Sequence, residues 1–499
     1  MSTAYGVTSV VLVVLAAVLI GTFGVRLSRT TSDFYVASRT VSPLWNASAI
    51  GGEYLSAASF LGIAGLILTY GADMLWLPVG WTGGYLVLLV LVSAPLRRSG
   101  AYTLPDFAEA RLESMAVRRM AGVLVVMIGW LYLMPQFQSA GLVLRAITGA
   151  PDWAGGLLVA AVVVVNVISG GMRSITFVQA FQYWLKLTAL AVPLVFLLLA
   201  WRADGAPGLS AQDAATWALP LSSGKEYGLY STYSLILATF LGTMGLPHVL
   251  VRFYTNPDGR AARRTTLVVL SLLGAFYLLP AVYGALGRIY VPELRGSDAV
   301  VLTLPGRLIG GVAGDLLTAL VTAGAFAAFL STSSGLTVSV AGVIGQDILK
   351  GGVRSFRAAT LVAVVVPLGL ATSARSLPVA DVVGLAFAVA ASSFCPLLVL
   401  GIWWWRLTST GAMAGLLVGG GLACGAVLLT IAGGPYTGLP GALLAQPAAW
   451  TVPIAFAVMV VVSLLTPGRI PAGVARIMVR LHTPETLDLD RGDWRPRSS

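Results

Sequence analysis

An acidic residue and two glycines lie inside an apolar run, where they could help to bind an ion or a small solute. The stretch "IGGEYLSAASF" starts at Ile50 and places Gly51, Gly52 and Glu53 within residues 43–70. A glutamate at bilayer depth costs roughly 3 kcal/mol, and each glycine weakens a helix by about 1 kcal/mol relative to alanine. These residues are typical of a functional site rather than of a plain membrane helix.

A second apolar run carries a comparable interruption. The stretch "GTMGLPH", from Gly242 to His248, contains Pro247, which removes a backbone donor and clashes with the preceding turn. The two interruptions are five expected spans apart. Broken helices at matching places in two halves indicate an inverted-repeat transporter that binds substrate and ions at unwound backbone. The alternative is that the glycines only allow close helix packing.

Hydroxyl groups line one face of a later apolar run. In "AAFLSTSSGLTVS", Ala328, Ser331 and Thr332 are spaced i, i+3 and i+4 and share a helical face. Hydroxyl and carbonyl oxygens are ligands that a small hard cation prefers. The alternative is that these hydroxyls bond back to their own helix or to a neighbouring one.

Three further titratable residues lie within expected spans. Lys186 lies about 16 Å from the end of its helix, at 1.5 Å per residue, so it requires a partner. It could offset Glu53, attract an anionic substrate or bind carbonyl oxygens. Arg252 lies near the end of its span and is expected to extend to the membrane surface. His248 is expected to be a hydrogen-bonded histidine that shapes the broken helix, with a proton carrier as the alternative.

The composition identifies a membrane protein. Of 499 residues, 57% are hydrophobic and 10% are charged, and the mean hydropathy is +0.87, which excludes an ordinary soluble globule. Apolar runs of about 20 residues predict thirteen spans. They are residues 5–25, 43–70, 74–96, 118–146, 152–171, 175–201, 230–255, 265–287, 306–345, 356–373, 378–402, 411–431 and 450–467.

The positions of the basic residues predict the orientation. The first 25 residues contain no Lys or Arg, whereas Arg26, Arg29 and Arg39 follow, which places the N-terminus outside and does not resemble a signal peptide. With thirteen spans, the segments expected in the cytoplasm hold 22 of the 31 basic residues and the outside segments hold seven. We therefore expect a multi-pass protein of the cell membrane with a cytoplasmic C-terminus.

The remaining features exclude several classes of function. No extramembrane segment is long enough for a soluble domain, and there is no GxxxxGK[ST] motif for ATP hydrolysis. The net charge of +11 is spread over the loops and indicates no nucleic-acid partner. Cys395 and Cys424 lie in apolar runs and suggest neither a disulfide framework nor a metal site. An ion gradient must supply the energy, or the protein is a passive channel or a sensor.

From about Ser32 to Leu407 the chain resembles the solute:sodium symporter family and, within it, the cation/acetate (monocarboxylate) symporters. Seven motifs in order carry this resemblance. They are "TSDFYVASR", "GEYLSAASFLGI", "YTLPDF", "SGGMRSITFVQ", "GTMGLPHVLVRFYT", "VGLAFAVAASSFCP" and "WWWRLTSTGAMAG".

The resemblance implies an all-α polytopic membrane protein with a LeuT-type inverted repeat of five plus five helices. The expected parts are the first helix and its loop, the first repeat, an outer loop, the second repeat, two peripheral helices and a cytoplasmic tail. Their ranges are 1–42, 43–201, 202–229, 230–402, 403–467 and 468–499.

The resemblance also implies a site for Na⁺ as the coupling ion. Its expected ligands are the backbone carbonyls of Gly52 and Leu55 together with Ala328, Ser331 and Thr332, with the glycines allowing the helix to unwind so that carbonyls face the ion. Sodium-coupled relatives often carry an aspartate where this chain has Thr176. The candidates for substrate binding or coupling are Glu53, Tyr54, Ser56, Gln136, Thr176, Gln179, Lys186, Gly245 and His248.

The expected function is secondary active uptake of a small monocarboxylate, in the class of acetate, propionate or pyruvate, together with Na⁺. No catalytic chemistry, cofactor or obligate protein partner is expected. Coupling to H⁺, with Glu53 or His248 as its carrier, is one alternative. A same-fold symporter for a neutral solute such as proline, urea or a sugar is another, and a membrane sensor or channel is a third.

Overall fold

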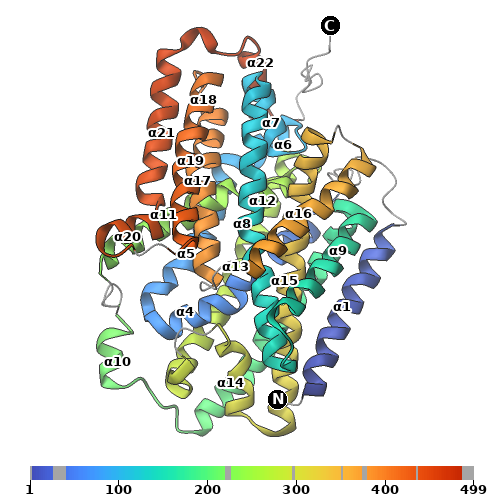
Figure 1. Cartoon of the computed structure of the whole chain (residues 1–499), viewed down its shortest axis with the longest axis vertical. Helices are drawn as coiled ribbons and strands as arrows, with labels where there is room; N and C mark the ends of the chain where they lie inside the picture. Colours follow the sequence, from blue (N-terminus) through green and yellow to red (C-terminus); the bar gives the residue numbers. More distant parts are fainter. Residues whose placement is uncertain are drawn as a thin grey trace.

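The computed structural model describes residues 3–25, 41–219, 226–294, 298–349, 352–373, 379–433 and 436–485, and every regular element in these ranges is helical. The "TSDFYVASR" motif and Arg26, Arg29 and Arg39 lie outside the described residues. Figure 1 shows a helical bundle in which α1 begins at one end, while α6, α7 and α22 gather at the other.

The helices follow the expected apolar runs. Up to residue 253 they are α1 (Thr3–Val25), α3 (Pro43–Tyr54), η2 (Ala58–Gly62), α4 (Ile63–Tyr70), η3 (Gly71–Leu75), α5 (Trp76–Val87), η4 (Leu88–Val92), α6 (Ser93–Ser99), α7 (Leu104–Leu112), α8 (Met115–Thr148), α9 (Asp152–Ala203), α10 (Ala211–Thr216), α11 (Gly228–Gly245) and α12 (Pro247–Phe253). Beyond it they are α13 (Gly259–Tyr290), η5 (Pro292–Leu294), α14 (Val300–Leu308), α15 (Gly311–Val343), η6 (Ile344–Ile348), α16 (Val353–Ser373), α17 (Val379–Trp403), α18 (Ser409–Gly415), η7 (Leu416–Gly420), α19 (Gly421–Ile431), α20 (Gly438–Ala445), α21 (Ala448–Leu465), η8 (Pro467–Arg469) and α22 (Val474–His482).

Ten helices of the described residues are long and apolar enough to cross a membrane, or eleven if the bent pair α11 and α12 is one span. The expected number of thirteen is not confirmed by this count and stays a prediction. Two expected spans, 152–171 and 175–201, both lie in α9 on either side of Gly171, whose φ of 57° and ψ of −153° are not helical. Glycine suits this kink because a side chain rarely adopts a positive φ.

The expected ninth span, residues 306–345, starts too early. The chain leaves α14 at Leu308 and begins α15 at Gly311. Gly310 and Gly311 have φ of 64° and 55°, so two adjacent glycines in positive-φ conformations separate the helices. The apolar character of both segments concealed this break in the sequence.

Both expected helix breaks are present, the first of them later than expected. Helix α3 ends at Tyr54, Leu55 has a non-helical ψ of 82°, and the chain resumes a helix at η2. Gly51 and Gly52 therefore lie in the last turns of α3, and the expectation that they form the unwound turn is wrong. The second break lies at Leu246, where α11 and α12 bend by 42° before Pro247 starts the new helix.

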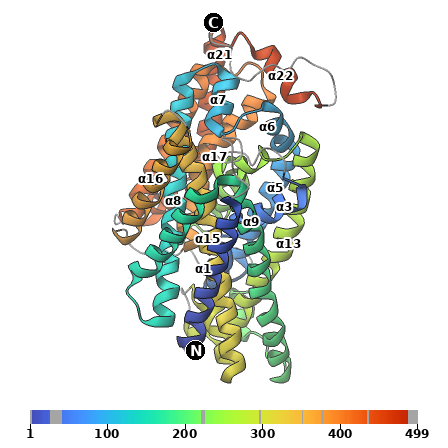
Figure 2. The same ribbon diagram turned by 90° about the vertical axis from the view of Figure 1, so that its right-hand side faces the viewer.

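Helices from distant parts of the chain surround the breaks. Helix α9 packs against α15, α3 and α8, and α11 packs against α17 and α5. Figure 2 shows α1 along the outside of α9 and α15, which it contacts. This arrangement brings the end of α3, the second half of α9 and the middle of α15 together.

Candidate functional site

Lys186 lies at the centre of the candidate site. Its ammonium group donates hydrogen bonds to the backbone oxygen of Gly52, to that of Leu55 at 2.7 Å and to Ser331 Oγ at 2.9 Å. The side chain is completely buried. Because α3 ends at Tyr54, the Gly52 carbonyl is among the last four of the helix, which have no partner within it. Lys186 thus binds the carbonyls that the break leaves available.

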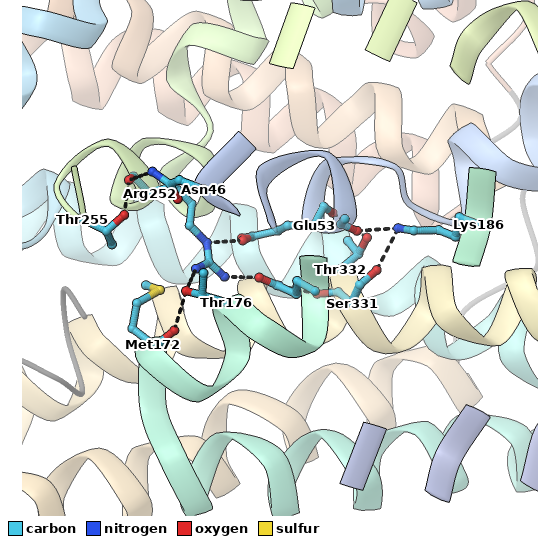
Figure 3. Close-up of polar contacts among 11 residues, drawn as sticks. Asn46, Glu53, Met172, Thr176, Lys186, Arg252, Thr255, Ser331 and Thr332 are labelled. Carbon is cyan, nitrogen blue, oxygen red and sulfur yellow. Dashed lines mark hydrogen bonds and ion pairs between the residues drawn. The ribbon is translucent and has the colours of Figure 1, made fainter. Parts of the chain in front are cut away.

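The five residues expected to bind Na⁺ gather around this ammonium group. Besides the three acceptors of Lys186, Thr332 Oγ1 donates to the backbone oxygen of Glu53 at 2.6 Å, and Ser331 Oγ lies 3.1 Å from the backbone oxygen of Ala328. Figure 3 shows Ser331 and Thr332 of α15 facing the end of α3. The shared helical face expected from the sequence therefore points at the break.

Glu53 forms a buried ion pair with Arg252 of α12. The distance from Arg252 Nε to Glu53 Oε2 is 2.8 Å, and each side chain is 1% exposed. Figure 3 shows the Arg252 guanidinium extended between α3 and α9. Arg252 donates further to Thr176 Oγ1 at 2.8 Å and to Gln179 Oε1.

The network continues from α9 to α15. Gln179 Nε2 donates to the backbone oxygen of Ser331 at 2.7 Å, and Asn46 of α3 donates to the backbone oxygen of Arg252 at 3.0 Å. The two broken helices are therefore joined to each other and to α9 and α15. Thr176, which stands where sodium-coupled relatives often carry an aspartate, acts here as an acceptor for Arg252.

The expectation that Arg252 extends to the membrane surface is wrong, because its side chain is buried against Glu53. Burying one charge requires another nearby, and Glu53 supplies it. The partner of Glu53 expected from the sequence was Lys186. The signal that could have identified Arg252 is its position: it follows the second break by six residues, and matching breaks bring the two helices together.

An aromatic cluster surrounds Phe387 of α17. The Phe387 ring lies 6.1 Å from Tyr54, 5.6 Å from Trp81 and 5.9 Å from Tyr132, and His248 lies 5.3 Å from Tyr132. These residues come from α3, α5, α8 and α12, so the cluster spans both broken helices. Of these residues only Tyr54 and His248 were predicted from the sequence, because single aromatic residues in apolar spans give no distinguishing pattern.

Several polar atoms of this region are buried without a hydrogen-bond partner among the described residues. They include Trp81 Nε1, Tyr85 Oη and both ring nitrogens of His248, so the expectation that His248 is hydrogen-bonded is wrong for the described residues. The Tyr85 ring lies 4.9 Å from the Tyr54 ring, so it belongs to the same cluster. A buried donor left without a partner is unfavourable, and such donors are suited to bind a polar ligand.

The other candidates mainly hold the helix breaks in place. Gln136 Oε1 accepts from the Ala57 backbone at 3.0 Å, just after the first break, and Tyr54 Oη lies 2.7 Å from Thr243 Oγ1 of α11. Ser56 is buried within the first break. A Cβ on Gly245 would lie 2.4 Å from the Ala390 backbone oxygen, so this glycine allows α11 to pack closely on α17.

Comparison with known proteins gives matches over most of the chain. The family model described as "Sodium:solute symporter family" matches residues 34–419. The "Uncharacterized symporter YwcA" of Bacillus subtilis (strain 168) is 33% identical over 461 residues, which cover 87% of this chain and 89% of that protein. A "Monocarboxylic acid transporter" of Corynebacterium glutamicum is 32% identical over 475 residues, covering 86% of each.

Two solved structures share the fold. A Na⁺-coupled sialic acid symporter in a substrate-bound outward-open state matches with a TM-score of 0.74 and 14% identity, over 93% of this chain and 98% of its own. A nucleobase-cation-symport-1 family transporter, closed with bromovinylhydantoin bound, matches with a TM-score of 0.62 and 13% identity, over 91% and 99%. The likeness to the sialic acid symporter shows the LeuT fold, with its inverted repeats.

Proposed function

Because the chain belongs to the sodium:solute symporter family, we propose that it takes up a small monocarboxylate together with a cation by alternating access. The protein is a multi-pass membrane transporter and not an enzyme. A relative of 32% identity that is called a monocarboxylic acid transporter supports the substrate class. The class comprises acetate, propionate and pyruvate.

The single observation that carries the substrate class is the set of buried donors around Phe387. Trp81 Nε1 and Tyr85 Oη have no partner among the described residues. A carboxylate only accepts hydrogen bonds, so a small monocarboxylate would satisfy these donors while its short apolar part packs on the aromatic rings. We place the substrate there, between the two broken helices, where inverted-repeat transporters bind their solutes.

Family membership supports Na⁺ as the coupling ion. One observation favours H⁺ as a second candidate, because the Lys186 ammonium donates to three of the groups expected to bind Na⁺. In either case we propose that the repeats comprise residues 43–201 and 230–402, with the N-terminus outside and the C-terminus in the cytoplasm. The protein requires no protein partner in this scheme.

Exchange of labelled pyruvate tests the substrate class. Pyruvic acid is a stronger acid than acetic acid, so little of it crosses lipid in its neutral form. Purified protein in liposomes preloaded with unlabelled pyruvate should concentrate labelled pyruvate transiently, and acetate and propionate should compete. Competition by proline, urea or a sugar but not by acetate would indicate a neutral-solute symporter. Flux that does not saturate would indicate a channel.

Removing the buried donors tests the placement of the substrate. Tyr85→Phe and Trp81→Phe should each weaken pyruvate binding about 10- to 100-fold, because a hydrogen bond to a charged group contributes about 1.5–3 kcal/mol. The melting temperature should not fall in Tyr85→Phe, since this hydroxyl has no partner among the described residues, whereas Trp81→Phe also removes part of a buried ring and should lower it. Binding and thermal unfolding are measured on the same purified protein. Normal binding with a lowered melting temperature would place the substrate elsewhere.

A further inference from the structure

The ammonium group of Lys186 has all its donors in use. It carries three N–H bonds, and it donates to three oxygens, those of the Gly52 and Leu55 carbonyls and the Ser331 hydroxyl. The side chain is completely buried among α3, α9 and α15. It is therefore a fixed cation in a cage of oxygens and is not available to bind a substrate carboxylate.

These oxygens are among the Na⁺ ligands that the resemblance to the symporter family implies. A sodium ion prefers several oxygens in close contact, and the ammonium already lies on three of the five expected ligand groups. The remaining hydroxyl, on Thr332, donates to the Glu53 backbone oxygen. A second cation at this place would overlap with the ammonium and be repelled by it, so the residues present do not fit a sodium ion.

Lys186 is the positive charge inside this cage, because the carboxylate of Glu53 is paired with Arg252. Glu53 adjoins the end of α3, but its Oε2 atom lies 2.8 Å from Arg252 Nε. The carboxylate is thus directly paired with Arg252, while the ammonium is held by uncharged oxygens. Three uncharged oxygens thus accept from the ammonium, and the carboxylate is bound elsewhere.

We propose that the Lys186 ammonium is a tethered cation that takes the place of Na⁺ in this cage, so that Na⁺ does not bind there. This inference rests on the proposed function, in which a cation gradient drives uptake. Lys186 lies in the first proposed repeat and Ser331 in the second, so the tethered cation joins the two repeats as a bound ion would. Coupling to Na⁺ would then require a different set of oxygens.

Binding of ²²Na⁺ to the purified full-length protein tests this proposal. The Na⁺ binding of the wild type should be unchanged in Ser331→Ala/Thr332→Ala, because no Na⁺ occupies the cage. Lys186→Ala should open the cage and create an additional Na⁺ site that the wild type lacks, with about one more Na⁺ bound per protein molecule at saturation. Adding Ser331→Ala/Thr332→Ala to Lys186→Ala should remove the new site, because hydroxyls of the cage would form it.

Two outcomes would overturn the proposal. One is Na⁺ binding by wild type that Ser331→Ala/Thr332→Ala abolishes, and this result needs no change at Lys186, so it decides even if Lys186→Ala does not fold. The other is a folded Lys186→Ala protein that gains no Na⁺ binding. Pyruvate exchange by the same wild-type preparation distinguishes failure of the proposed function from failure of this inference. Absence of exchange counts against the proposed function, whereas the Na⁺ binding measurements alone decide the inference.

Discussion

Replacing Gly52 with valine is expected to abolish transport and to leave little folded protein. A Cβ at Gly52 would lie 2.1 Å from the Gln179 backbone oxygen and 2.8 Å from its carbon. The obstacle is the backbone of α9, which cannot rotate away as a side chain can, so α3 and α9 must separate. Overpacking a core destabilises a protein by about 1–3 kcal/mol and occasionally by more. The cost should be at the high end here, because the added Cβ meets backbone atoms.

Separating α3 from α9 also moves the groups of the site. Lys186 of α9 donates to the Gly52 carbonyl, and Gln179 of α9 accepts from Arg252. A matched control is Gly274→Val in α13, because nothing lies within 4 Å of a Cβ built at Gly274. The control should show a near-normal melting transition and near-normal pyruvate exchange. Gly52→Val should show neither. A fully active Gly52→Val protein would contradict the close packing of α3 on α9.

The second large effect is expected at the buried pair of Glu53 and Arg252. Arg252→Met should lower the free energy of unfolding by about 3–5 kcal/mol, because it leaves a buried carboxylate without its cation. Glu53→Gln should cost less, since the amide oxygen still accepts from Arg252. The double variant Glu53→Gln/Arg252→Met should be more stable than Arg252→Met alone, because no buried charge of this pair remains.

Thermal unfolding of the wild type, both single variants and the double variant gives the coupling between the two residues. Additive effects would show that the pair does not act as one unit. Transport assays of the same variants give a second test. If Glu53→Gln keeps wild-type stability and pyruvate exchange but loses gradient-driven uptake, Glu53 is a proton carrier rather than a structural partner. Gly52→Val should be more damaging than Glu53→Gln in both assays.

The sequence was sufficient for the large features of the fold, for physical reasons that particular residues make clear. Long apolar runs in the absence of water can only form helices or closed barrels, and Pro247 marks the break at Leu246 directly. The first break follows Tyr54 and not the glycines, because glycine in a sequence marks either an unwound turn or a close helix contact and local spacing does not distinguish the two. Gly51 and Gly52 instead allow α3 to approach Tyr183 and Gln179 of α9.

The polar site was predictable only in part. Spacing along one helix revealed the shared face of Ser331 and Thr332, since such neighbours are fixed by helical geometry. The pairing of Glu53 with Arg252, 199 residues apart, depends on how distant helices pack, and local patterns do not encode it. The same applies to Lys186: carbonyl oxygens were among its possible partners, but its position among the expected sodium ligands depends on how α3, α9 and α15 pack.

Gradient-driven uptake of labelled pyruvate into proteoliposomes tests the central claim, cation-coupled monocarboxylate transport, most directly. An inward Na⁺ gradient and an inward H⁺ gradient are imposed separately, with protein-free liposomes as the control for leakage. At least one gradient should drive pyruvate above its outside concentration, and collapsing this gradient with an ionophore should release it. Pyruvate that only equilibrates under both gradients, in a preparation that still exchanges pyruvate, would contradict the claim.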